Sequence, residues 1–217
     1  MTRCKPHVAM SHVNAAVRRR KPRRGYARAT ARVFGLSEGH TEVLYEDFEL
    51  ALPAGRITAV VGPSGSGKSV LLRQLARQRP DVVSLDAEVL AGCRASAIDA
   101  VSDTATLAER MDVLSRCGLA EATSLITSAQ RLSAGQIYRL ALARALLACE
   151  PGAVLLADEF AGTLDPPTAQ VLAAMLRGLV ARQEISAVVA THRWDLLPLL
   201  APSQVIVKPL GEPAQKL

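Results

Sequence analysis

The stretch that decides the fold reads Gly62-Pro63-Ser64-Gly65-Ser66-Gly67-Lys68-Ser69 and follows the apolar run Ile57-Thr58-Ala59-Val60-Val61. The pattern G-x-x-x-x-G-K-S is typical of a phosphate-binding P-loop when it joins a strand to a helix. The apolar run predicts a buried strand, and residues 70–76 have helical spacing. Backbone N–H groups and the helix dipole favour an anion in such a loop. Lys68 can reach the β- and γ-phosphates, and Ser69 can bind magnesium. The alternative is a glycine-rich turn with one exposed lysine, which the flanking strand and helix disfavour.

Composition indicates one α/β domain with a core of Ala, Leu and Val. Of the 217 residues, 49% are hydrophobic but only 3% are aromatic. No uninterrupted apolar run reaches the ~18 residues of a membrane helix, so we expect a soluble chain that meets a membrane only through a partner. The four cysteines form no C-x-x-C pair, which predicts reduced thiols and a cytoplasmic location.

Positive charge is concentrated at the start of the chain. Residues 1–32 hold ten Lys and Arg and no acid, whereas the remainder has 16 basic and 20 acidic residues. We therefore expect a basic, flexible N-terminal arm over residues 1–32 and a mildly acidic domain over residues 33–217. The arm is either a solvated tail, a nucleic-acid or anionic-surface contact acting through counterion release, or an organelle transit peptide.

Weaker patterns organise the remainder of the chain. Residues 41–50 alternate loosely and predict an edge strand or strand pair, and residues 52–56 predict a turn. A short strand is expected at 81–85, irregular structure at 87–106 and a helix carrying Leu107, Met111, Leu114 and Leu119. Residues 134–148 predict a strong helix whose N-cap is Ser133.

Two further apolar runs end in polar side chains. Residues 153–157 lead into Asp158 and Glu159, and residues 187–191 lead into His192. The carboxyl end of a buried parallel strand is where ligands bind in such sheets, so one acid can hold magnesium and the other can polarise a water. Alone, the acids would indicate the start of a loop and the histidine a structural role.

Taken in order, these motifs resemble the nucleotide-binding domain of the ATP-binding cassette (ABC) family. The P-loop is its Walker A motif, and Leu132-Ser133-Ala134-Gly135-Gln136 is similar to its signature L-S-G-G-Q. Residues 155–159 resemble the Walker B motif with the catalytic glutamate, residues 163–165 the D-loop, and His192 the switch histidine. The resemblance implies a P-loop NTPase of the α/β class. It would have a mostly parallel central sheet flanked by helices, an antiparallel β edge and a reduced helical subdomain over about residues 87–150.

The resemblance also implies a head-to-tail homodimer with two ATP molecules between its subunits. Magnesium would be held by Ser69 and Asp158, and the catalytic residues would be Glu159 and His192. Phe34 is the first candidate to stack on adenine, followed by His40 and Tyr45. The expected nucleotide-binding residues are Phe34, Gly62, Pro63, Ser64, Gly65, Ser66, Gly67, Lys68, Ser69, Val70, Ser133, Ala134, Gly135, Gln136 and Asp165.

Three departures from the family pattern bear on the role of the chain. Only 62 residues separate Ser69 from Leu132. No glutamine fits the position of the family's Q-loop, and Asp99 is the candidate for that position. Residues 160–162 read Phe-Ala-Gly instead of the family's Pro-Thr-Ser. We therefore expect a soluble, non-transporter ATPase, similar to ABC ATPases joined to an acetyltransferase-like domain. The alternatives are the ATP-binding subunit of an ABC transporter, with a membrane partner, and an ATP-controlled nucleic-acid switch that uses residues 1–32.

Overall fold

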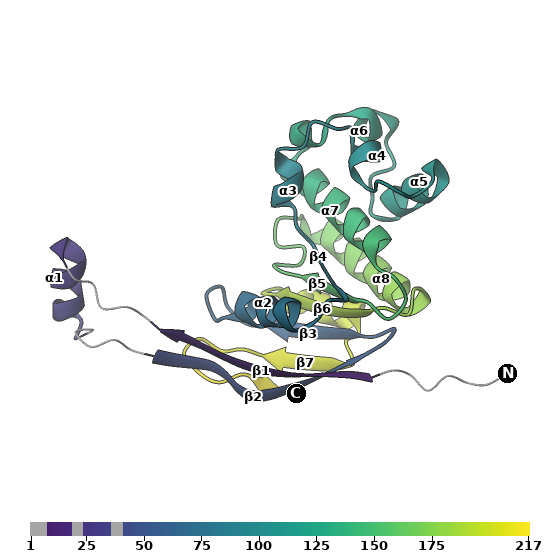
Figure 1. Cartoon of the computed structure of the whole chain (residues 1–217). Helices are drawn as coiled ribbons and strands as arrows, with labels where there is room; N and C mark the ends of the chain where they lie inside the picture. Colours follow the sequence, from purple (N-terminus) through teal and green to yellow (C-terminus); the bar gives the residue numbers. More distant parts are fainter. Residues whose placement is uncertain (1–7, 19–23, 36–40) are drawn as a thin grey trace.

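A mostly parallel, six-stranded sheet forms the centre of the computed structural model, which describes residues 8–18, 24–35 and 41–217 (Figure 1). The strand order is β4-β5-β6-β3-β7-β8, and only β8 runs antiparallel to its neighbour. The strands are β3 (Ile57–Val61), β4 (Val82–Ser84), β5 (Val154–Ala157), β6 (Ser186–Thr191), β7 (Gln204–Val207) and β8 (Gln215–Lys216). All residues of β3, β5 and β6 are buried, as expected for strands that are covered on both faces.

Helices cover both faces of this sheet. On one face, α2 (Lys68–Gln78) packs through Leu71, Leu72 and Leu75. On the other face lie α7 (Ala134–Ala148), α8 (Pro166–Arg182) and α9 (Leu197–Leu200). Alternate residues of β6 point to opposite faces of the sheet. Val188 and Ala190 pack in the core on the α2 face, and Ala187 and Val189 pack in the core on the face of α7, α8 and α9.

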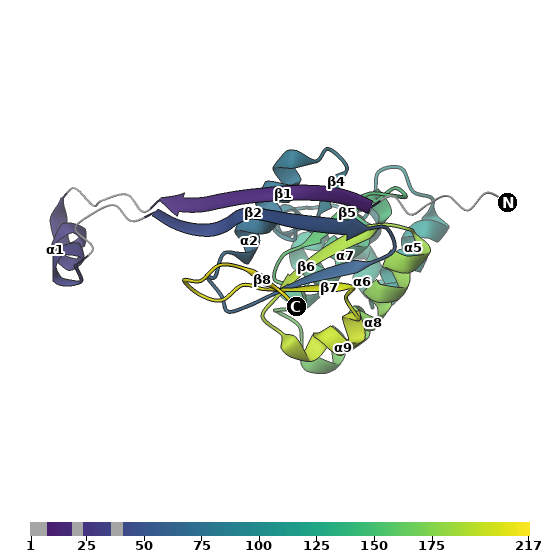
Figure 2. The same ribbon diagram turned by 90° about the horizontal axis from the view of Figure 1, so that it is seen from below.

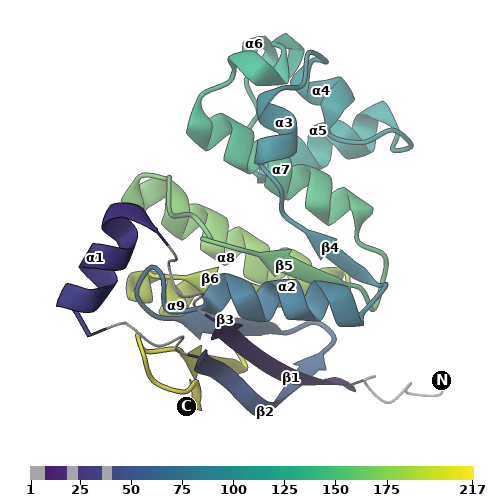
Figure 3. The same cartoon turned by 60° about the vertical axis from the view of Figure 1, so that its left-hand side comes forward.

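A smaller helical region is built around the start of α7 (Figure 3). It contains α3 (Glu88–Ala91), α4 (Ala97–Ala100), α5 (Leu107–Arg116) and α6 (Ala122–Ile126). The expected irregular segment 87–106 thus includes two short helices. The helix expected around Leu107 is present, but Leu107 and Met111 are exposed whereas Leu114 and Leu119 are buried.

A two-stranded antiparallel sheet lies over α2 (Figure 2). Its strands are β1 (Val8–Arg18) and β2 (Thr41–Pro53), so β2 includes the expected strand at 41–50 and runs on into the expected turn. The helix α1 (Gly25–Val33) stands away from the central sheet at the far end of this ribbon.

The expected flexible arm over residues 1–32 is wrong for residues 8–18, which form β1. Val13 is fully buried and Ala15 nearly so, and both join the core formed by α2 and β2. The basic run at residues 18–24 overlaps β1 only at Arg18, so the charge of the whole segment did not reveal the alternating buried residues of this strand. Residues 19–23 of that run lie outside the described residues, and nucleic-acid binding by the arm stays a prediction.

Two further observations concern the helices and cysteines of the described residues. None of the helices in this part of the chain is long and apolar enough to span a bilayer. Cys93, Cys117 and Cys149 are free thiols there, in line with the absence of a C-x-x-C pair.

If β1 belongs to the folded domain, shortening Val13 should destabilise the whole protein. Val13→Ala is expected to lower the free energy of unfolding by about 2 kcal/mol, because it removes buried methyl groups and leaves a cavity. The matched control is Met10→Ala on the same strand, where the side chain is 54% exposed. Chemical denaturation of both variants measures the difference, and equal stability would contradict the role of β1.

Candidate functional site

The glycine-rich loop joins β3 to α2 as the sequence predicts. Gly67 is the N-cap of α2 with a φ of 104°, and Lys68 begins the helix with only 7% of its surface exposed. The Lys68 Nζ donates hydrogen bonds to the carbonyl oxygens of Gly62 and Pro63, both at 2.8 Å. The lysine therefore spans the loop from within and presents a cation where phosphate oxygens would enter.

The charge of Lys68 interacts with the two carboxylates that follow β5. Burial lowers the pKa of Lys68, whereas the negative charges of Asp158 and Glu159 act in the opposite direction. The side-chain oxygen of Ser66 is also buried and has no hydrogen-bond partner in the described part of the chain. A buried polar atom without a partner is costly, and a phosphate oxygen in the loop is a suitable ligand for it.

Residues of β2 and of the segment directly after β7 contact the P-loop, which the sequence did not indicate. A Cβ atom on Gly62 would lie 2.1 Å from the carbonyl oxygen of Lys208, so only glycine fits there. Tyr45, from β2, donates a hydrogen bond from its hydroxyl to the carbonyl oxygen of Gly67 at 3.3 Å. Lys208 directly follows β7 and is fully buried, with its Nζ donating to the carbonyl oxygens of Pro209 and Glu212.

The acidic pair lies at the edge of a cleft of about 460 Å³. Its lining residues are Leu85, Asp86, Ala87, Glu88, Tyr138, Asp158, Glu159 and Thr163. Asp158 follows β5 and accepts a hydrogen bond from the backbone N–H of Glu159 at 3.0 Å. The Glu159 side chain is exposed, so its carboxylate is accessible to water.

Asp86, not Asp99, occupies the position beside the acids. Asp86 follows β4, the neighbour of β5, and its carboxylate accepts from the N–H groups of Glu88 and Val89 at 3.0 and 3.3 Å. Asp99 lies on α4 in the helical region and accepts from the Ser96 hydroxyl. The expectation for Asp99 is therefore wrong. The signal for Asp86 was its place directly after the strand predicted at 81–85.

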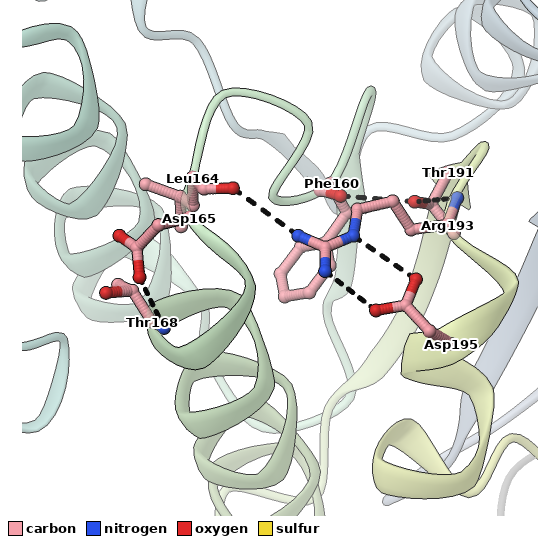
Figure 4. A network of polar contacts seen from close by, with 7 residues as sticks. All are labelled: Phe160, Leu164, Asp165, Thr168, Thr191, Arg193 and Asp195. Atoms are coloured by element: carbon pink, nitrogen blue, oxygen red, sulfur yellow. Dashed lines mark hydrogen bonds and ion pairs between the residues drawn. The ribbon is translucent and has the colours of Figure 1, made fainter.

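The segment between β5 and α8 contacts residues that follow β6 (Figure 4). The Cε1 atom of His192 is 3.4 Å from the position that a Cβ on Gly162 would take, so the imidazole lies against the segment after Glu159. Asp165 caps α8 by accepting from the Thr168 N–H at 3.1 Å, and its hydrogen bonds with Thr168 lower its pKa. Arg193, which the sequence did not indicate, donates to the Leu164 carbonyl oxygen at 3.4 Å and pairs with Asp195.

The signature-like motif begins α7 and lies in the helical region rather than on the P-loop (Figure 3). Ser133 is the N-cap, as predicted, and forms a reciprocal pair of hydrogen bonds with Gln136. Gln136 also donates to the Ser124 hydroxyl at 3.1 Å, and Gly135 lies against Leu164. Ser133 and Ala134 are exposed, so the start of this helix is accessible to another molecule.

The aromatic candidates for adenine have different environments. Phe34 ends α1 and is 71% exposed, so its ring is accessible. Tyr45 is only 2% exposed and supports the P-loop from beneath. His40 lies outside the described residues. Adenine stacking by Phe34 stays a prediction.

Magnesium fits the donor set that the sequence suggests. Across the described ranges, no three or more His, Cys, Asp or Glu side chains gather into a metal site. Mg²⁺ ordinarily uses one or two protein oxygens together with water and substrate phosphates, so a closed protein cage is not required. Ser69 at the start of α2 and Asp158 directly after β5 would be the oxygen donors for such a shared site.

These features define a P-loop NTPase, and comparisons with known proteins identify the family. A family model described as an AAA domain matches residues 54–200. The lipoprotein-releasing system ATP-binding protein LolD of Maricaulis maris is 32% identical over 77% of this chain and 87% of its own length. The phosphonates import ATP-binding protein PhnC of Burkholderia pseudomallei is 29% identical over 75% of this chain and 67% of its own length.

Solved structures show the same fold. The dimeric bacterial ABC transporter cassette MJ0796 superposes with a TM-score of 0.64 at 21% identity, covering 82% of this chain and 91% of its own. A bacterial Atm1-family ABC exporter with ATP bound gives a TM-score of 0.62 at 20% identity, covering 78% of this chain and 35% of its own. The chain belongs to the ATP-binding cassette family of ATPases.

Since only glycine fits beside Lys208, Gly62→Ala should displace the loop and abolish measurable ATP binding. The contact of 2.1 Å is to backbone, which has no flexible end that could move aside. The matched control is Gly178→Ala on α8. An added Cβ at this position would meet no atom within 4 Å apart from its own helix, and alanine favours a helix. Calorimetric titration with ATP measures both variants, and wild-type affinity in Gly62→Ala would contradict this account of the loop.

Proposed function

We propose that two copies of this chain close head-to-tail around ATP and hydrolyse it with magnesium. The observation that carries the proposal is the separation of the two motifs within one chain. The P-loop lies on the central sheet, whereas the exposed Ser133 and Ala134 begin α7 in the helical region. A helix N-terminus binds an anion through its free N–H groups, so that of α7 can cap a γ-phosphate held by another copy.

Hydrolysis is a transfer of the γ-phosphoryl group to water. Lys68, Ser66 and the loop N–H groups hold the phosphates, and the exposed carboxylate of Glu159 polarises the attacking water. The water oxygen forms the new bond to phosphorus as the bond to the β-phosphate oxygen breaks, and Glu159 accepts the proton that the water loses, giving ADP and phosphate. His192 lies against the Glu159 segment and can orient the water or the γ-phosphate. Magnesium, held by Ser69 and Asp158, would neutralise phosphate charge.

Removing the charge of Glu159 tests this assignment. Glu159→Gln is expected to lower kcat by at least about 100-fold, because a general base contributes at least that much. ATP affinity should persist, since Lys68 and the loop are unchanged. Phosphate release and ATP titration measure the two quantities, and Glu150→Gln, at an exposed position just after α7, is the matched control. Undiminished hydrolysis by Glu159→Gln would remove Glu159 from this role.

The head-to-tail arrangement can be tested by mixing two inactive variants. Lys68→Ala destroys the P-loop half of each site, and Ser133→Arg blocks the signature half. Random mixed dimers would retain one intact composite site, so equal mixing should raise turnover above that of either variant alone, to at most about a quarter of wild-type turnover. Each variant alone, at the same total concentration, serves as the control. Turnover that stays at the level of the single variants would argue against composite sites.

For the biological role we propose a cytoplasmic ATPase that works without a conventional membrane partner. Supporting observations are the 62 residues between Ser69 and Leu132 and the presence of Asp86 in place of a glutamine beside β5. The ATP-binding subunit of a transporter is a second candidate, favoured by the names of LolD and PhnC. The discriminating observation is whether Glu159→Gln, loaded with ATP, co-purifies with an integral membrane protein.

A further inference from the structure

The turn that carries Glu159 has an uncommon backbone conformation. Glu159 has a φ of 47° and Ala161 a φ of 55°, values that residues other than glycine seldom adopt. Such a conformation persists only where neighbouring groups hold it. The groups that hold this turn therefore also decide where the Glu159 carboxylate lies.

One side of the turn is held by β6. The N–H of Phe160 donates to the carbonyl oxygen of Ala190 at 2.8 Å, and the Thr191 hydroxyl donates to the carbonyl oxygen of Phe160 at 3.2 Å (Figure 4). This side leads directly to His192.

The other side is held by α7, the helix that starts with the signature motif. The backbone N–H of Ala161 donates to the hydroxyl oxygen of Tyr138 at 2.9 Å. The Tyr138 ring meets the Phe160 ring edge-on, with the centroids 6.3 Å apart. Tyr138 is only 6% exposed and follows Gln136 by two residues, so the motif and this contact lie within the first turns of one helix.

We propose that Tyr138 is a positioning residue for Glu159 and transmits the docking of the signature motif to the catalytic turn of the same chain. Contact of Ser133 with the nucleotide held by the second copy fixes the start of α7, and the Tyr138 hydroxyl then fixes the N–H of Ala161. Each chain of the dimer would thereby bring its own Glu159 carboxylate into position once its own signature motif contacts the nucleotide held by the other chain. Phe160 completes the contact, which gives a physical reason for an aromatic residue after Glu159. The inference rests on the proposed catalytic role of Glu159.

Tyr138→Phe tests the link, because it keeps the ring beside Phe160 and removes only the acceptor of the Ala161 N–H. We expect kcat to fall about tenfold, as misplacement of a catalytic group lowers the rate without affecting binding. KM for ATP should stay within about twofold, since the variant leaves the P-loop unchanged. In a Glu159→Gln background, ATP should produce as much dimer with the Tyr138→Phe change as without it.

Ser186→Ala is the matched control, because its buried hydroxyl donates to the Leu52 carbonyl oxygen at 3.0 Å, away from the turn. Its kcat should remain near that of wild type. A wild-type kcat in Tyr138→Phe, or an equal loss in Ser186→Ala, overturns the inference, as does a loss of dimer. If Glu159→Gln itself hydrolyses ATP normally, the proposed function fails instead.

Discussion

The parallel pairing of β3, β5 and β6 is the constraint on which the site depends. Val61 pairs with Thr191 and Ala157 with Val189, so three strands end within a residue or two of one another at one edge of the sheet. The P-loop, the acidic pair and His192 each follow one of these strands. Segments that lie far apart in the sequence therefore meet because parallel strands place their carboxyl ends together.

The strands can hold this register because both faces of the sheet are covered. With few aromatic residues available, the cores are built mainly from aliphatic side chains of β3, β5 and β6 with α2, α7 and α8. The P-loop gains a second support from outside the parallel strands, through Tyr45 of β2 and the backbone of Lys208. A loop held in this way has its N–H groups arranged before a ligand arrives, which is the requirement for electrostatic stabilisation of a phosphoryl group.

The motifs that the sequence revealed are those whose geometry is local. The Gly67 turn, the Ser133–Gln136 capping pair and the Asp158 position depend on residues within a few places of one another. Pro166 after Asp165 was a comparable start signal for the 17-residue helix α8, which had no counterpart among the predicted elements. Asp99 was wrong because it lies on α4 in the helical region, whereas the position beside the acidic pair follows β4.

The sequence by itself determined the chemistry of this protein: a phosphate loop, a pair of acids after a buried strand, and a capped helix able to meet an anion. Short-range sterics and hydrogen bonding are sufficient for those features. Only the tertiary structure decided that β1 belongs to the domain and that Asp86 and Tyr138 line the cleft. It also decided that the backbone carbonyl of Lys208 packs directly against Gly62. These contacts join residues from separate elements, and their geometry follows from how the sheet and helices pack rather than from spacing along the chain.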